Sequence, residues 1–181
     1  MIDLETFLQL VDRVIQLAGF RIENRRQLFT EIVEPLFHEL EPLVDDYFLL
    51  FRDAYRKAQA STQSELRGSV GKIRDSRERL WYARTKVVEM AKAMRVGVKD
   101  DRLVDFAERV AGFFYSSQFE IPPKMSTAGR MVELCDYVLE EKLEKKELLD
   151  YIEQTQKELQ DSWIGIVQIY GHLRLYCLRY S

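Results

Sequence analysis

The chain has 181 residues, of which 46% are hydrophobic and 31% are charged, and its formal net charge is −3. This composition is typical of a folded, water-soluble protein and excludes a disordered chain. The near balance of charge leaves no surplus positive field of the kind that attracts nucleic acid. Only eight glycines and four prolines punctuate the chain, which favours long helices.

The two cysteines, Cys135 and Cys177, belong to no CxxC motif and no spaced Cys/His set. We therefore expect no disulfide framework and no zinc site. The first ten residues carry two acids and no basic region, so no signal peptide is expected, and a cytoplasmic location is predicted. Polar residues interrupt the most apolar stretch, residues 163–180, so no membrane span is expected either.

Apolar residues recur at helical spacing over residues 3–19 and again over residues 24–60. The second segment contains Glu-Pro-Leu twice, and the apolar register continues without a slip through Pro35 and Pro42. Seven residues make nearly two turns, so both prolines point the same way. We predict one curved helix whose proline-bearing edge faces water, with a break at either proline as the alternative.

That edge also carries carboxylates and an imidazole, which raises the question of a metal site. The di-metal pattern of helical bundles needs Glu-x-x-His on two helices, and this sequence has no such motif. We therefore interpret the edge as a solvated acidic face and expect no metal and no cofactor. The residues concerned are Glu31, Glu34, His38, Glu41 and Asp45.

A third long helix is predicted to begin at Thr62, because Thr62 followed by Glu65 fits a capping box. Gly97 is a plausible C-terminal cap, and Asp100 or Asp101 can begin a shorter helix that reaches about Ser117. The third helix has a seam at spacings of four and three, as in a coiled coil, made by Leu66, Val70, Ile73, Arg77, Leu80, Arg84, Val87, Ala91 and Met94.

A loop with a double proline, residues 118–126, divides the chain into an N-terminal helical bundle, residues 1–117, and a C-terminal part, residues 127–181. The C-terminal part keeps one helical register and contains no proline. It is predicted to form one helix of about 50 residues, or about 75 Å. The alternative is a helical hairpin with a restart at Asp161-Ser162. The two parts together are expected to make a single domain.

Residues 67–86 hold seven basic and two acidic residues, and residues 133–158 hold nine acids and four lysines. The favoured interpretation is that these helices attract each other. Arg77 and Arg84 occupy seam positions, where a guanidinium needs a partner. They are expected to pair with carboxylates such as Glu140, Glu144 or Glu147, or to reach the edge of the seam. The functional alternative is an anion or partner site made by Arg77, Arg84, Arg74 and Lys72.

A helix of about 75 Å would extend beyond a compact bundle and expose part of its apolar seam. The simplest partner that could bury this surface is a second copy of the chain. A homodimer, or a complex with another protein through the same surface, is therefore predicted. The candidate interface residues are Trp163, Ile166, Tyr170 and Leu173.

These expectations combine into an all-α, elongated bundle of five or six helices, at least two of them long, with coiled-coil-like seams. No nucleophile–base pair can be assembled, so no catalytic residue and no enzymatic activity is expected. The predicted function is a non-catalytic interaction or assembly module, either a subunit or a regulator of a larger complex. The alternative is a regulator that binds an anionic ligand or nucleic acid through the basic helix, residues 67–86.

Overall fold

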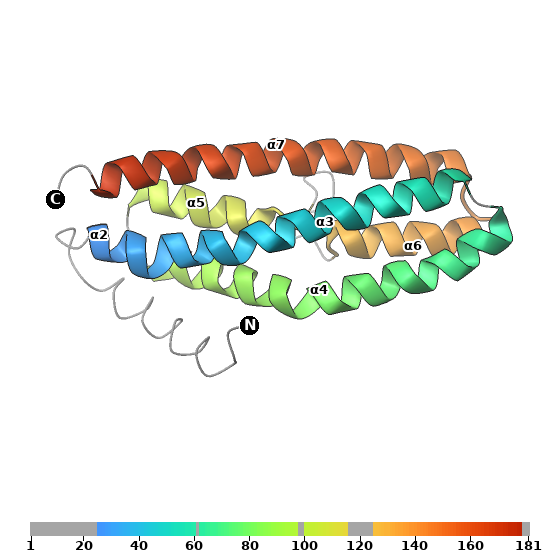
Figure 1. Ribbon diagram of the computed structural model, residues 1–181, viewed down its shortest axis with the longest axis horizontal. Coiled ribbons are helices and arrows are strands. Elements are labelled where there is room, and N and C mark those ends of the chain that lie inside the picture. Colours follow the sequence, from blue (N-terminus) through green and yellow to red (C-terminus); the bar gives the residue numbers. More distant parts are fainter. Residues whose placement is uncertain (1–24, 61, 98–99, 116–124, 179–181) are drawn as a thin grey trace. The chain divides into compact units, whose positions relative to one another are not determined.

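The computed structural model describes residues 25–60, 62–97, 100–115 and 125–178, and these ranges contain helices and connecting turns but no strand. The all-α prediction is confirmed, whereas the helix expected over residues 3–19 lies outside the described residues. The elements are α2 (Arg25–Leu28), a π-helical turn η2 (Phe29–Val33), α3 (Glu34–Ala60), α4 (Gln63–Gly97), α5 (Asp101–Gly112), α6 (Thr127–Leu139) and α7 (Lys145–Leu178) (Figure 1).

The chain forms two compact units, and three helices contribute to both of them. Unit 1 consists of Met1–Pro42, Arg84–Gly112 and Trp163–Ser181, and thus contains α5 and one part each of α3, α4 and α7. Unit 2 consists of Leu43–Ala83 and Phe113–Ser162, and contains α6 and the other parts of the same three helices. The proline-containing loop, residues 118–126, lies almost entirely outside the described residues.

The segment with two prolines is helical from residue 25 to residue 60, so the prediction of a continuous helix is confirmed. The helix accommodates Pro35 by widening just before it. The backbone N–H of Glu34 donates to the carbonyl of Phe29, five residues back, as in a π turn. Pro42 lies inside α3 and is exposed, as are its edge neighbours His38, Glu41 and Asp45, whereas Glu31, Glu34 and Pro35 at the start of this edge are half-buried.

Helix α4 begins with the predicted capping box. The backbone N–H and the hydroxyl of Thr62 both donate to the Glu65 carboxylate, at 2.7 and 2.9 Å. These bonds lower the pKa of Glu65, the bond from the Thr62 backbone most of all. The predicted seam is also found, because seven of its nine positions are buried, Arg84 among them. Leu80 and Arg77 are half-buried.

The two shorter helices also begin at side-chain caps. Asp100 accepts the backbone N–H of Arg102 at 3.0 Å at the start of α5, and Ser126 accepts that of Gly129 at 3.2 Å at the start of α6. Helix α5 ends at Gly112 and not near Ser117. Six apolar residues of the segment expected to be helical are nevertheless buried: Leu103, Phe106, Ala107, Val110, Phe113 and Phe114.

The C-terminal part is a helical hairpin, but the chain turns at residues 140–144 and not at Asp161. Both a single helix of about 50 residues and a restart at Asp161 are therefore wrong. The N–H of Glu141 donates to the carbonyl of Val138 at 3.2 Å, and that of Lys142 to Tyr137 at 2.9 Å. This pair of bonds is a Schellman motif, and it places Glu141 at a left-handed φ of 58°.

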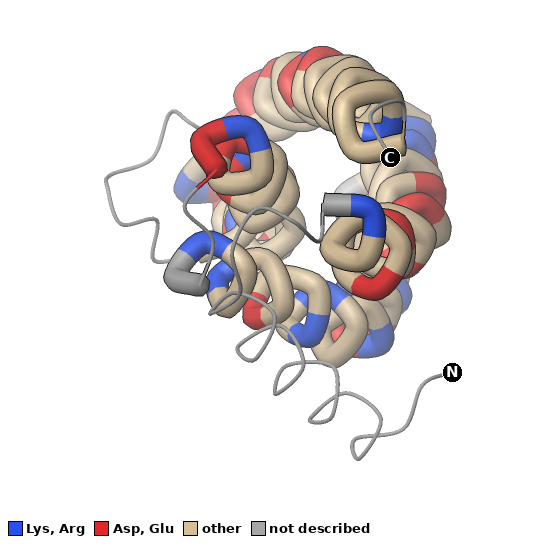
Figure 2. The backbone as a smooth tube through the Cα atoms, turned by 90° about the vertical axis from the view of Figure 1, so that its left-hand side faces the viewer, with Lys and Arg blue, Asp and Glu red and all other residues tan. Residues whose placement is uncertain are grey.

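Charged residues occur on every described helix (Figure 2), but the core of each unit is aromatic and aliphatic. In unit 1 the ring of Phe37 stacks on Tyr170, with centroids 3.8 Å apart, and on Trp163 at 5.4 Å. In unit 2 the rings of Phe113 and Phe114 both pack edge-on against Tyr47. The contribution of each buried ring is of the order of several kcal/mol, so these clusters hold the helices of each unit together.

Candidate functional site: a groove between α3 and α4

The four basic residues predicted to form one site lie in different surroundings. Lys72 lines a groove between α3 and α4, whereas Arg74 donates to both carboxylate oxygens of Asp136 on α6, at 2.9 and 3.1 Å. Arg77 is half-buried, and its Nε finds no hydrogen-bond partner in the described part of the chain. Arg84 is buried and belongs to unit 1. The structure therefore does not bring the four together.

The expected attraction between the basic and the acidic helix is seen at Arg74 and Asp136, not at the seam arginines. In the described ranges neither Arg77 nor Arg84 forms an ion pair with Glu140, Glu144 or Glu147. The carboxylates of Glu140 and Glu147 instead take part in contacts around the turn between α6 and α7, where Glu144 contributes its backbone. Glu140 pairs with Lys142 at 2.7 Å, and Glu147 accepts the backbone N–H of Glu144 at 3.0 Å.

Lys86 does not contribute to the exposed basic surface. Its side chain is only 7% exposed and donates to the carboxylate of Glu39 on α3 at 3.0 Å. With Arg84 and Lys86 buried, the exposed bases of residues 67–86 are Arg67, Lys72, Arg74 and Arg79. They share the surface of α4 with the exposed acids Asp75 and Glu78. The positive excess at the surface is therefore smaller than the sequence suggested.

The groove lies on unit 2, where α3 and α4 run antiparallel because only two residues separate Ala60 from Gln63. It has a volume of about 470 Å³. Its floor is apolar, with Leu43, Leu50 and Ile73 each buried, while Leu49 at its edge is 44% exposed. The lining residues are Leu43, Asp46, Leu49, Leu50, Asp53 and Lys57 of α3, and Lys72, Ile73, Ser76, Arg79, Leu80 and Ala83 of α4.

Opposite charges line the two sides of this groove without neutralising each other. Asp46 and Asp53 lie on α3, and Lys72 and Arg79 lie on α4. None of the four forms an ion pair within the described residues. Arg79 donates instead to the hydroxyl of Ser76 at 3.1 Å. The groove therefore has an apolar floor, an α3 rim with Asp46, Asp53 and half-buried Lys57, and a basic α4 rim, and both rims have charges available to a bound molecule.

A second hollow of about 440 Å³ lies in the same unit, beside the start of α4 and the turn between α6 and α7. Most of its charged lining residues form hydrogen bonds or ion pairs at the turn and at the adjoining helix ends. Lys145 donates to the backbone carbonyl of Gln59 at 3.1 Å, Lys142 pairs with Glu140 at 2.7 Å, and Glu147 accepts the backbone N–H of Glu144 at the start of α7. We interpret this hollow as a part of the structure that joins two helix ends.

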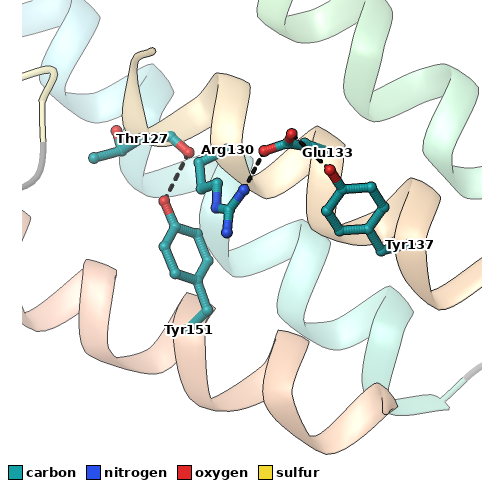
Figure 3. A network of polar contacts seen from close by, with 5 residues as sticks. All are labelled: Thr127, Arg130, Glu133, Tyr137 and Tyr151. Carbon is teal, nitrogen blue, oxygen red and sulfur yellow. Dashed lines mark hydrogen bonds and ion pairs between the residues drawn. The ribbon is translucent and has the colours of Figure 1, made fainter. Parts of the chain in front are cut away.

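A polar network links α6 to α7 in unit 2 (Figure 3). The hydroxyl of Tyr151 donates to the carbonyl of Thr127 at 3.0 Å, while Glu133 accepts from Arg130 and from the hydroxyl of Tyr137. The Arg130 hydrogen bond lowers the pKa of Glu133, the Glu133 bond raises that of Tyr137, and burial raises that of Tyr151 to about 12. All three shifts move away from neutrality, so no carboxyl or phenol here is poised for proton transfer at neutral pH.

The acidic edge of α3 contains one contact between a histidine and a carboxylate, with Nδ1 of His38 3.3 Å from Glu41. In the described ranges no group of three or more His, Cys, Asp or Glu side chains is arranged to hold a metal ion. Neither Cys135 nor Cys177 is in a disulfide and both are buried, and burial raises the pKa of Cys135 to about 12, so its thiol is neutral and unreactive at physiological pH.

Two of the four predicted interface residues are buried within the chain, and the other two, Trp163 and Tyr170, are half-buried. Ile166 and Leu173 are buried, and Trp163 and Tyr170 stack on Phe37 of α3. The premise of that interface, a single helix longer than the bundle, disappears because the chain turns back at residues 140–144. Two other features carry no clear signal in the sequence. They are the groove, marked only by exposed Leu49, and a row of exposed apolar residues on the opposite face of α7.

No protein-family model, no curated protein and no solved structure matches this chain. Of the helices described, none combines the length and the apolar character needed to cross a lipid bilayer.

Proposed function

We propose that the protein is a non-catalytic helical interaction module that binds an α-helix of a partner protein in the groove between α3 and α4. It would act as a cytoplasmic subunit or regulator of a larger complex. The observation that carries the proposal is the groove's combination of an apolar floor with rims of opposite, unneutralised charge.

The shape of the groove favours a helical ligand. Its α3 side extends from Leu43 to Lys57, which is about 21 Å at 1.5 Å per residue, or four helical turns. Amphipathic helices bind such grooves by placing apolar residues, spaced by three and four, on the floor. A nonpolar small molecule would leave the charged rims unused.

The charges define the chemistry of the partner helix. One flank should carry Lys or Arg opposite Asp46 and Asp53, and the other flank should carry Asp or Glu opposite Lys72 and Arg79. Complementary rim charges accelerate association and suppress wrong partners more than they increase affinity. We therefore expect most of the binding free energy to come from the apolar floor and most of the specificity from the rims.

The proposal can be tested with a designed amphipathic peptide of about five turns, with a leucine stripe, lysines on one flank and glutamates on the other. Fluorescence anisotropy of the labelled peptide, titrated with the full chain, would measure the affinity. Leu49→Glu should weaken binding by roughly tenfold or more, because it places a charge where the apolar stripe docks. Gln59→Glu is the matched control, since it adds the same charge to α3 outside the groove and should have no effect.

A peptide with lysines on both flanks should bind less tightly than the mixed peptide, because one of its flanks faces Lys72 and Arg79. The proposal would be wrong if the mixed peptide shows no binding at millimolar protein concentration. Equal losses for Leu49→Glu and Gln59→Glu would equally exclude the groove as the binding site.

A second candidate function is binding of an anionic ligand or nucleic acid through residues 67–86, and one observation supports it. Trp81 and Tyr82 are 52% and 48% exposed on the same helix as the basic residues. Exposed aromatics among basic side chains suit stacking with single-stranded nucleic acid. A salt titration of binding to a labelled oligonucleotide would separate the candidates, because phosphate contacts give a steep loss of affinity with salt.

Self-association belongs to the same proposal. A second copy of the chain is a partner in addition to the helical ligand, although the face made by Trp163, Ile166, Tyr170 and Leu173 is occupied within the chain. The surface available for a second copy lies on the other side of α7.

A further inference from the structure

The outer face of α7 in unit 1 carries a row of exposed apolar residues. Ile164, Val167, Leu175 and Leu178 are 47%, 41%, 49% and 39% exposed. Together with Gly171 they follow spacings of three, four, four and three, which places them in one line along the helix. Single exposed apolar residues are normal on a protein surface, but a continuous row marks a contact with another molecule.

This part of α7 is also depleted of charge. Residues 162–178 contain one charged residue, Arg174, whereas the preceding 17 residues of the same helix, 145–161, contain eight. The turns of α7 near the C-terminus are accordingly mostly tan in Figure 2. Exposed helix faces normally carry Lys, Arg, Glu and Asp, and the centres of protein interfaces are depleted of them.

The row is symmetric about Gly171. Ile164 and Leu178 lie seven residues on either side of it, and Val167 and Leu175 lie four residues on either side. A Cβ added at Gly171 would meet no atom within 4 Å, so this position is open and lets another backbone approach closely. An antiparallel copy of the same row would match every apolar residue with an apolar residue.

We infer that two copies of the chain associate through this face of α7, with antiparallel helices and a two-fold axis passing beside Gly171. In this arrangement Ile164 packs against the partner's Leu178, and Val167 packs against the partner's Leu175. The interface is self-complementary, as a two-fold axis requires.

The expected association is weak and concentration-dependent. Four turns of one helix offer less than the roughly 800 Å² per partner that stable interfaces bury. We therefore expect dissociation in the micromolar range or above, consistent with reversible assembly. The inference rests on the proposed function only in that the chain works by association. It uses a face of unit 1, whereas the groove belongs to unit 2.

Sedimentation equilibrium of the full chain over a wide concentration range tests the inference. The average mass should rise from 21.5 kDa toward twice that value. Leu175→Glu should weaken the dimer by roughly tenfold or more, because two glutamates would enter one small apolar contact. Leu49→Glu is the matched control, since Leu49 is similarly exposed but lies in the groove, and it should leave dimerisation unchanged.

The same two variants separate this inference from the proposed function. Leu175→Glu should bind the designed peptide normally, and Leu49→Glu should dimerise normally. A chain that dimerises but does not bind the peptide would refute the groove alone, and a chain that binds the peptide as a permanent monomer would refute the dimer alone. Circular dichroism would confirm that both variants remain folded.

Cysteine cross-linking tests the antiparallel geometry, and the native cysteines are buried. Gly171→Cys should form a disulfide-linked dimer, because the axis brings the two positions together. Ile164→Cys should not cross-link with itself, because the two sites would be about 21 Å apart, but it should cross-link with Leu178→Cys in a mixture. Self-linking at Ile164 would show a parallel pair and overturn the geometry. A monomer at every concentration that binds phosphatidylcholine vesicles through α7 would overturn the dimer and assign the face to a lipid surface.

Discussion

The two halves of α7 share one inner periodicity but differ in their outer faces. In residues 145–161 the inner face buries Leu148, Ile152 and Leu159, and the outer face is densely charged. In residues 162–178 the inner face buries Ile166 and Leu173, and the outer face is apolar with one charge. The inner face of a helix locates the core, which any fold requires, whereas the composition of the outer face carries information about partners.

The inner faces are also held by different chemistry. The C-terminal half depends on stacked rings, with Phe37 of α3 between Trp163 and Tyr170. The N-terminal half depends on aliphatic residues and on the hydrogen bond from Tyr151 to the carbonyl of Thr127 (Figure 3). Removing a ring should therefore lower the free energy of unfolding more than removing one hydroxyl group.

The largest effect is expected for Phe37→Ala. Phe37 is 6% exposed and stacks on two rings of α7, so its removal should lower the free energy of unfolding by about 3–5 kcal/mol. Urea denaturation followed by circular dichroism would measure the loss. Leu49→Ala, at an exposed position, should cost less than about 0.5 kcal/mol. A loss below 1 kcal/mol for Phe37→Ala would show that the stacked rings do not hold this half of α7.

This core was predictable in position but not in detail. The three-and-four spacing placed Ile166 and Leu173 on one face with Trp163 and Tyr170, and that face is indeed the one that packs against the core. The sequence could not show that residues 29–37 cover it, because the partner of a helix face is decided by tertiary packing. The face was therefore interpreted as an interface, and the outer row around Gly171 was overlooked.

A smaller effect is expected for Tyr151→Phe in the other half. At pH 8 the change removes the hydrogen bonds of the hydroxyl, with the Thr127 carbonyl and with the Thr155 side chain, and should cost about 1 kcal/mol or more. Burial raises the pKa of Tyr151 to about 12, above the value near 10 of an exposed tyrosine. The stability that the neutral phenol contributes is therefore complete below pH 10 and is lost as the pH rises toward 12.

At pH 11 the unfolded phenol is ionised while the folded one is still neutral, which costs about 1.4 kcal/mol. The stability advantage of the native chain over Tyr151→Phe should therefore shrink by this amount between pH 8 and pH 11. Paired urea titrations at the two pH values would measure it, and other high-pH groups such as Cys135 cancel in the difference. An advantage that does not change with pH would mean that Tyr151 is not buried in the folded protein.

The turn before α7 could not be predicted from the sequence, for a physical reason. Residues 140–144 contain no glycine or proline, and the apolar register passes through them without a slip. Local signals therefore favoured a continuous helix. The turn depends instead on Glu141 adopting φ 58°, a conformation that is unfavourable for a residue with a Cβ and that packing of α6 against α7 must stabilise.

Glu141→Gly is accordingly expected to stabilise the protein, by about 0.5–1 kcal/mol. Glycine occupies the left-handed region without strain, and this gain exceeds the entropy that glycine adds to the unfolded chain. Glu140→Gly is the matched control, because Glu140 has φ −88° and gains nothing from glycine, so it should be destabilised by a similar amount. Urea midpoints of the two variants should therefore move in opposite directions. If both variants unfolded at a lower urea concentration than the native chain, residue 141 would have a right-handed backbone conformation and α6 would continue into α7. The assignment of an inner, covered face and an outer, exposed face of α7 would then be wrong.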